Sequence, residues 1–248
     1  IDGTFELSLD DVPKSAQVQL LVQKARFRKV TPISVTACQV QDAAPSTTKL
    51  PGHAAEGDVP KIVVSSGNSD HLNTVLDALG IEYDCVKGIN PNSDTCTNTT
   101  TLADLLRNST LLNSYGMLFI SCSFGGTYES VLSDASAVTN LQNYVAAGGK
   151  VIVTDDSYDY VEQVFPDAIN FEPPTTTPTV AQPKKAAEVG DSNLNVNATV
   201  NDPDMVAWLK LLGATNVDNT VKVSGFLSQW AVMNAAEQGT TVLVEGDI

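Results

Sequence analysis

Short apolar runs alternate with amphipathic segments along most of the chain. The clearest case lies between residues 115 and 158, where the run MLFI and a second apolar run at residues 151–153 flank an amphipathic segment that ends at Gly148-Gly149. Apolar runs on either side of a helical pattern are typical of a parallel βαβ unit. Because strand and helix patterns alternate on both sides of this unit, the sequence predicts an α/β fold: a Rossmann-like domain whose parallel sheet carries helices on both faces.

Cap and stop signals place the other elements. Thr101 and Asp104 have the spacing of a capping box ahead of a short helix, and Asp202-Pro203 starts a helix that Gly213 ends. We expect the remaining elements as strands at residues 62–64, 81–85, 221–223 and 241–244, a helix from Ser69 to Gly80 with Leu72, Val75, Leu76 and Leu79 on one face, and a short helix at residues 158–165.

Three regions follow from this pattern. Residues 1–40 predict strands at 3–7, 18–23 and 33–38 with a turn at 10–14, which is an incomplete β-sandwich, so we expect more chain before Ile1. Residues 41–60 are polar and carry Pro and Gly, as in a linker or a strap over the next domain. Residues 61–248 form the α/β domain, and its stretch 170–202 shows no periodicity, which predicts a long loop or flap.

Composition narrows the classes of partner. At 42% hydrophobic the 248-residue chain can bury a core. The net charge of −15 argues against nucleic acid and against anionic membranes, because both attract clustered Lys and Arg. No apolar run approaches the roughly 20 residues of a spanning helix, so we expect no direct membrane insertion. No GxGxxG, Walker or G-x-S-x-G motif is present, and no cofactor is implied.

The four cysteines favour an oxidising compartment. Cys85 and Cys96 bracket a polar loop of the kind a disulfide closes, and an even count in a Thr- and Asn-rich chain is typical of extracellular proteins. Zinc is the competing interpretation, but no C-x-x-C pair exists and the histidines are only His53 and His71. Three segments match the N-glycosylation sequon, at Asn98, Asn108 and Asn197.

Ligands of open parallel sheets bind at the carboxyl ends of the strands. Three loops at such ends can be read from the sequence: the one after residue 64, the one after residue 120 and the one after residue 153. We therefore expect any pocket to be lined by Ser66, Gly67, Ser123, Gly125, Gly126, Asp155, Asp156 and Ser157.

Two catalytic hypotheses attach to these loops. Cys122 is the one cysteine at a strand end and could act as a nucleophile; the alternatives are a buried small residue or half of a disulfide with Cys38. The carboxylates of Asp155, Asp156 and Asp159 could bind a hard cation, although a solvated acidic turn would look the same. Either hypothesis would make the protein a hydrolase.

Four stretches resemble a group of uncharacterised secreted bacterial proteins. They are FELSLDDVP with VQLLVQKARFRK, EGDVPKIVVSSGNSDHLNTVLDALGIEYD, YGMLFISCSFGG, and LQNYVAAGGKVIVTDDSY. In that group a carboxypeptidase-regulatory-like β-domain precedes a Rossmann-like domain of the class I glutamine-amidotransferase (ThuA-like) type. The resemblance covers much of residues 1–165 and, more faintly, the helix around Trp208.

The resemblance also separates this chain from active amidotransferases. Their nucleophilic cysteine lies in a glycine-rich elbow after the strand that follows the Gly-Gly turn, where this chain has residues 154–157, TDDS. Residues 170–248 contain no histidine, so the His-Glu pair of the triad has no counterpart. The group carries cysteines at the places of Cys38 and Cys122, which implies a disulfide between the β-segment and the sheet domain.

These observations lead to one expectation for function. We expect a secreted or cell-surface protein on an amidotransferase-like scaffold that has lost catalysis and serves binding or structure. The expected partners are other cell-surface proteins, further copies of the chain, or glycans.

Overall fold

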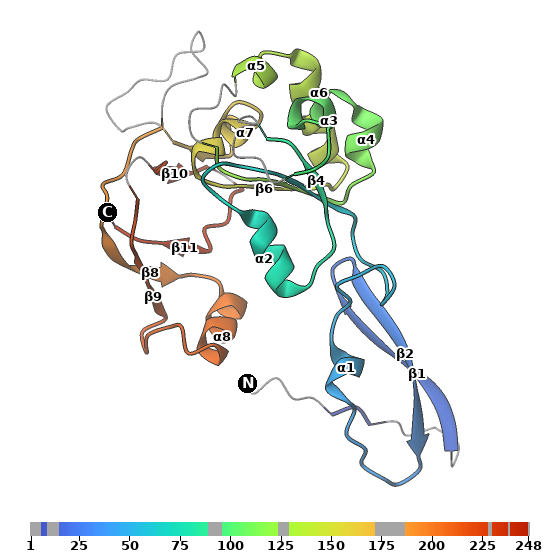
Figure 1. Cartoon of the computed structure of the whole chain (residues 1–248). Helices are drawn as coiled ribbons and strands as arrows, with labels where there is room; N and C mark the ends of the chain where they lie inside the picture. The colour runs from blue at the N-terminus through green and yellow to red at the C-terminus, as the bar shows by residue number, and fades with distance from the viewer. Residues whose placement is uncertain are drawn as a thin grey trace.

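A computed structural model describes residues 6–8, 15–88, 96–123, 129–171, 187–227, 230–237 and 239–247. Its centre is a parallel sheet in the order β4-β3-β5-β6, formed by β3 (Ile62–Ser65), β4 (Asp84–Val86), β5 (Met117–Ile120) and β6 (Lys150–Val153) (Figure 1). Strand β4, the second of these strands along the chain, is thus an edge strand beside β3, and β5 lies on the other side of β3. This order, with separate antiparallel sheets elsewhere, is consistent with a Rossmann-like α/β fold.

One face of the sheet carries most of the helices. These are α3 (Leu102–Arg107), α4 (Ser109–Asn113), α5 (Glu129–Leu132), α6 (Ala135–Ala146) and α7 (Asp159–Glu162), with the 3₁₀ turn η2 (Asp155–Ser157) before α7. Their apolar side chains, such as Leu105 and Leu141, pack with Leu118 and Ile120 of β5 in the larger core cluster. The Thr101–Asp104 capping box starts α3 as the sequence predicts.

The other face carries a single helix, α2 (Leu72–Leu79), which Gly80 ends in a left-handed conformation at φ +65°. Leu76 is buried there with Ile62 and Val64 of β3, whereas Val75 and Leu79 are more than half exposed. The predicted apolar stripe of this helix is therefore only partly used. The helix also begins later than predicted, because His71 rather than Ser69 precedes its first turn.

The N-terminal region forms a long antiparallel ribbon of β1 (Ser15–Lys24) and β2 (Phe27–Thr36), joined by a tight turn at Ala25-Arg26. The predicted strand at 33–38 is the end of β2, which begins six residues earlier. Residues 6–8 lie outside any strand, and the turn at 10–14 and residues 3–5 lie outside the described residues. The ribbon pairs with no third strand of the described chain.

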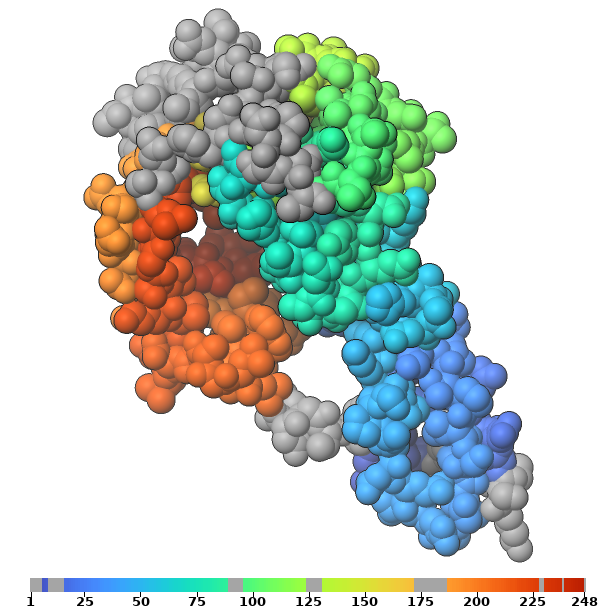
Figure 2. All heavy atoms as spheres, in the orientation of Figure 1, coloured from blue at the N-terminus to red at the C-terminus, as the bar shows by residue number. Residues whose placement is uncertain are grey.

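The ribbon is fixed at its turn and extends away from the α/β domain (Figure 2). Phe27 packs against the α2-side cluster, and the Arg26 guanidinium lies beside Gly116 and Gly148, which precede β5 and β6. The turn therefore contacts the amino-terminal edge of the parallel sheet.

The segment after β2 contacts both the ribbon and the sheet domain. The segment contains the short helix α1 (Pro45–Thr48). Its Asp58 exchanges two backbone hydrogen bonds with Arg28 of β2. Farther along, the Gly52 carbonyl accepts a hydrogen bond from the Glu82 N–H, and a Cβ on Gly52 would come within 2.0 Å of the Gly80 carbonyl oxygen. These contacts hold the segment against the loop that follows α2.

The C-terminal region has its own antiparallel sheet. Strand β8 (Asn195–Val200) lies between β9 (Thr220–Ser224) and β11 (Val244–Glu245), and α8 (Pro203–Leu211) connects β8 to β9. The prediction that residues 170–202 lack regular structure is therefore wrong for β8. Polar and apolar residues alternate in NVNATV, and Ala198 and Val200 are the buried positions.

A second pair of strands ties this region to the parallel sheet. Strands β7 (Ile169–Asn170) and β10 (Ala235–Ala236) pair antiparallel just after α7. Nearby, the Glu188 N–H donates to the Phe171 carbonyl, which adds a further connection to the segment after α7. No described helix is both long and apolar enough to cross a membrane.

Helix α2 offers a matched test of its packing. Leu76 is 4% exposed and Leu79 is 59% exposed on the same helix. We expect Leu76→Ala to lower the free energy of unfolding by about 2–5 kcal/mol, because it leaves a cavity against β3, and Leu79→Ala to change it by less than about 0.5 kcal/mol. Urea unfolding followed by circular dichroism gives both values, and equal losses would mean that α2 does not cover β3 as described.

Candidate functional site

The carboxyl ends of β3 and β5 meet at the point where the strand order reverses. Open α/β sheets bind ligands in the crevice at this switch point. Here the loop after β3 contacts the first residues after β5. A Cβ on Gly67 would lie 2.2 Å from the Cys122 carbonyl oxygen, and that oxygen also accepts the N–H groups of Ser69 (3.3 Å) and Asp70 (3.4 Å).

The serines predicted to line a pocket are buried in these loops. Ser66 accepts a hydrogen bond from the Gly88 N–H at its hydroxyl (3.1 Å), and the Ser157 hydroxyl donates to the Ser121 carbonyl (3.0 Å). Ser123 is 3% exposed. The hydroxyls of Ser66 and Ser157 thus connect neighbouring strand ends, while Gly125 and Gly126 lie outside the described residues.

Cys122 lies directly after β5 and is 1% exposed. Its backbone N–H donates to the Thr154 hydroxyl (3.0 Å), and its thiol donates to Oδ2 of Asp155 (3.9 Å). Burial raises the pKa of the Cys122 thiol to about 11, and the carboxylates of Asp155, Asp156 and Asp70 raise it further. A nucleophilic cysteine needs the opposite surroundings, a positive field and access to solvent.

Asp155 follows β6 in a sharp strand-to-helix turn with φ +43°, a left-handed conformation that Asp tolerates better than most residues. Its Oδ1 accepts the Ala231 N–H at 2.7 Å, across 76 positions of sequence. The turn has the position of a nucleophile elbow, but here the side chain binds the C-terminal segment.

Asp156 belongs to the same acidic group. Burial raises the pKa of its carboxyl to about 6, and the nearby charges of Asp155 and Asp70 add to the shift. Burial also raises the pKa of Asp155, although the hydrogen bond from Ala231 opposes this. Three carboxylates therefore share the edge of the sheet where a ligand would be expected.

The structure does not assemble the predicted metal ligands. No group of three His, Cys, Asp or Glu side chains within the described ranges is placed to hold a metal ion. Asp155 uses its oxygens on Ala231 and Cys122, and Asp159 lies in α7 beside Gln163. The alternative in which Asp155, Asp156 and Asp159 bind a cation together is thus not supported by this arrangement.

Of the two cysteine pairs, the structure contains one. Cys85 and Cys96 form a disulfide with a Cα–Cα distance of 5.8 Å, as predicted. The pairing of Cys38 with Cys122 is wrong, because Cys38 is an exposed free thiol and Cys122 a buried one. Cys38 follows the end of β2 that is remote from the ribbon turn, and a ten-residue strand of about 3.4 Å per residue separates it from the sheet domain.

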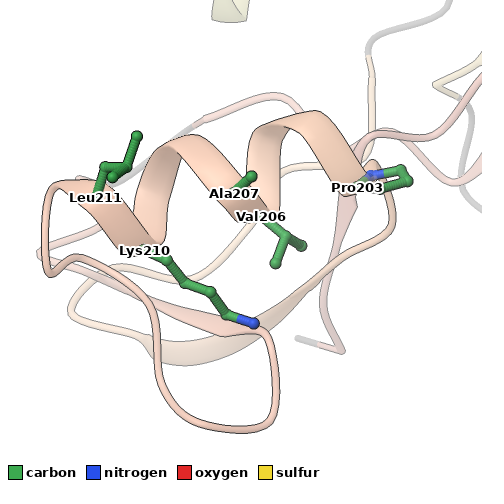
Figure 3. Close-up of a pocket in the computed structure, with 5 residues that line it drawn as sticks. All are labelled: Pro203, Val206, Ala207, Lys210 and Leu211. Atoms are coloured by element: carbon green, nitrogen blue, oxygen red, sulfur yellow. The ribbon is translucent and has the colours of Figure 1, made fainter. Parts of the chain in front are cut away.

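One hollow in the described part of the chain lies elsewhere. It measures about 460 Å³ and is formed on α8 by Pro203, Val206, Ala207, Lys210 and Leu211 (Figure 3). It is shallow, and its one charged side chain is Lys210. None of the predicted ligand residues contributes to it.

Sequence reasoning missed three parts of this edge. Asp70 follows the first loop closely enough that the strand-end rule could have included it. Thr154 begins the loop after residue 153, so the same rule could have included it, and its hydroxyl accepts the Cys122 N–H. Ala231 had no such signal, since it acts through its backbone N–H. Long-range backbone contacts of this kind leave no side-chain pattern in a sequence.

Comparison with known proteins adds no family to this geometry. No family model matches the chain, and no curated protein or solved structure is significantly similar to it.

The acidic group predicts a pH dependence of stability. In the folded chain the Asp156 carboxyl is protonated below about pH 6. In the unfolded chain an Asp carboxyl is protonated only below about pH 4. Between these values the folded chain binds more protons, so the free energy of unfolding rises as the pH falls from 7 to 5. A single carboxyl with this shift gives at most about 1.4 kcal/mol between these two pH values. Solvent screening lowers this value, so we expect a gain of about 0.5–1 kcal/mol. Chemical unfolding at pH 7 and pH 5 measures it.

Two variants isolate this effect. Asp156→Asn should flatten the difference between the two pH values, and Asp167→Asn, which removes an exposed carboxylate, should leave it as in the unchanged chain. A gain that survives in Asp156→Asn would assign the proton to another group.

Proposed function

We propose that this chain is a non-catalytic binding and assembly module that works outside the cytoplasm, at the cell surface or after secretion. Its partners in this proposal are other surface proteins or further copies of the chain. The main support for a non-catalytic role is the environment of Cys122, the one thiol at a strand end of the parallel sheet, which is buried beside three carboxylates.

The surroundings of Cys122 oppose the formation of a thiolate, although a backbone hydrogen bond from Asp156 lowers the pKa in part. A pKa of about 11 keeps the thiol protonated at neutral pH, and the protonated form is a poor nucleophile. The side chain that its sulfur contacts is the carboxylate of Asp155. That carboxylate is held by the Ala231 N–H and carries no positive charge to stabilise a thiolate.

The strand-end loops support binding by surfaces rather than in a deep crevice. Gly67, Ser66 and Ser157 join neighbouring loops through close contacts and hydrogen bonds at the switch point. A scaffold of the amidotransferase type that has lost its nucleophile would keep such a sheet without keeping an open site. The strand order β4-β3-β5-β6 is compatible with that scaffold.

The disulfide supports an oxidising compartment, because such bonds persist outside the reducing cytosol. It joins Cys85 in β4 to Cys96 and so fixes the edge strand of the sheet. The abundance of Ser, Thr and Asn on an acidic chain agrees with a soluble surface.

Thiol labelling tests the proposal directly. In the native, unreduced protein we expect iodoacetamide to label Cys38 within minutes and to leave Cys122 unlabelled until the chain is unfolded, because Cys38 is exposed and Cys122 is buried and protonated. Mass spectrometry of the peptides distinguishes the two sites, and Cys38→Ser provides the control. Rapid native labelling of Cys122 would contradict the proposal and favour a thiol hydrolase.

The disulfide gives a second prediction. Removing it as the double variant Cys85→Ser/Cys96→Ser should lower the free energy of unfolding by about 3 kcal/mol, the value expected for a loop of this length. The matched control is Cys38→Ser, which removes an exposed thiol and should leave stability unchanged. If the double variant is as stable as the parent, the protein does not depend on an oxidising compartment.

A further inference from the structure

The outer edge of β1 has no strand beside it in the described part of the chain. Strand β1 (Ser15–Lys24) pairs with β2 along its whole length, and neither the other sheets nor the isolated bridges involve it. A strand edge of ten residues presents a row of N–H and C=O groups that can pair with another strand.

The ladder shows which residues present those groups. On β2, the Arg28 N–H donates to Asp58, the Thr36 N–H donates to Gln41, and Pro32 has no N–H, so these alternate residues face away from β1. Residues opposite each other in such positions of an antiparallel ladder both face outward. On β1 the outward residues are therefore the cross-strand partners of these three and the positions between them: Ser15, Gln17, Gln19, Leu21 and Gln23.

This edge lacks the features that keep strand edges unpaired. Natural edges are protected by charged side chains, prolines, bulges or short length. Strand β1 has the sequence SAQVQLLVQK, with one charge at its end, no proline and an unbroken register. Its exposed face carries an apolar cross-strand pair, Leu21 at 50% and Val30 at 39% exposure.

The charge distribution favours one direction of pairing between two copies. Residues 12–41 contain none of the 29 acidic residues and five of the 14 basic ones, so the rest of the chain carries −20, that is, −15 minus +5. Two copies repel each other through their acidic bodies. The turn of each ribbon is held on the rest of its own chain, which we call the body. Antiparallel pairing of the ribbons therefore places the two bodies at opposite ends, about 30 Å apart. At physiological ionic strength salt screens charges beyond about 8 Å, so the bodies repel each other only weakly.

We infer that β1 is a self-association edge, at which two copies of this chain pair β1 with β1 antiparallel about Leu20 and form a four-stranded sheet with β2 strands outermost. In this register Gln19 lies opposite the partner's Leu21, and Val18 opposite the partner's Val22. Lys24 lies opposite the partner's Ala16, so no like charges face each other.

The register also brings the exposed apolar side chains together. The two copies of Leu21 become diagonal neighbours at about 7–8 Å, within reach of each other as long side chains. The interface is isologous, because the outward N–H and C=O groups of β1 in one copy pair with those of β1 in the other. Each copy then has its β1 edge covered, and the assembly closes as a dimer.

This inference deepens the proposed assembly function and rests on it, but the two fail separately. A chain that stays monomeric would remove the dimer and leave a non-catalytic module with other partners. A reactive Cys122 would remove the non-catalytic module and leave the dimer untouched.

Sedimentation equilibrium of the full chain between micromolar and submillimolar concentrations tests the dimer. The decisive variant is Gln19→Pro, which deletes an outward N–H of β1. Pro32 directly opposite shows that the ribbon accepts proline at this pair. The matched control is Ser34→Pro, which deletes an outward N–H on β2 instead.

We expect the unchanged chain and Ser34→Pro to dimerise equally. We expect Gln19→Pro to dimerise roughly 100-fold more weakly, because symmetry removes the hydrogen bond twice. Circular dichroism checks that each variant is folded.

A second pair of variants avoids proline. Leu21→Lys places two lysines near the twofold axis and should weaken the dimer about tenfold, whereas Val30→Lys makes the same change on β2 and should have no comparable effect. The inference is overturned by an unchanged chain that is monomeric at submillimolar concentration. It is also overturned by a dimer that tolerates both Gln19→Pro and Leu21→Lys, or by open-ended growth.

Discussion

Strand β3 is buried on both faces, and this requirement for cover organises the chain. All four of its residues, Ile62–Ser65, are at most 2% exposed. Val63 contacts the helices of the larger cluster, and Ile62 and Val64 contact α2 and Phe27. A central parallel strand of this kind can be stable only if apolar groups cover both sides. One helix covers the second face only in part, and Phe27 of the ribbon adds to the cover together with Ile81 and Tyr83.

That packing constraint also determines where the ribbon can act. Phe27 and Arg26 hold the ribbon turn at the amino-terminal edge of the sheet, which is opposite the edge that carries the strand-end loops. The loops there are closed by Gly67, Cys122 and Asp155, each of which contacts a backbone or side chain of a neighbouring loop. The two regions are thus separate: the described strand-end loops contact each other at one edge of the sheet, and the outer edge of β1 pairs with no other described strand.

The sequence allowed the parallel sheet to be predicted, because its strands and caps are local signals. The run MLFI and the Thr101–Asp104 box both specify their structure within a few residues. The ribbon was harder, since the charges of Arg28 and Lys29 conceal a strand that a partner strand and the following segment stabilise. At the candidate site, Asp155 could be located by the strand-end rule, but its bond to Ala231 depends on tertiary structure. The error on Cys38 has the same origin, because the length and direction of the ribbon carry that residue away from the sheet.

The distribution of charge links these features. An acidic chain resists association because its copies repel, yet the repulsion weakens steeply with distance in salt. The ribbon projects from the body and contains no carboxylate between residues 12 and 41, so it is the region where a second copy can approach at least electrostatic cost. Parallel pairing of two ribbons would bring the bodies side by side, whereas antiparallel pairing separates them by the length of the strands. For the proposed β1 dimer, the acidity of the body therefore favours the antiparallel orientation over the parallel one.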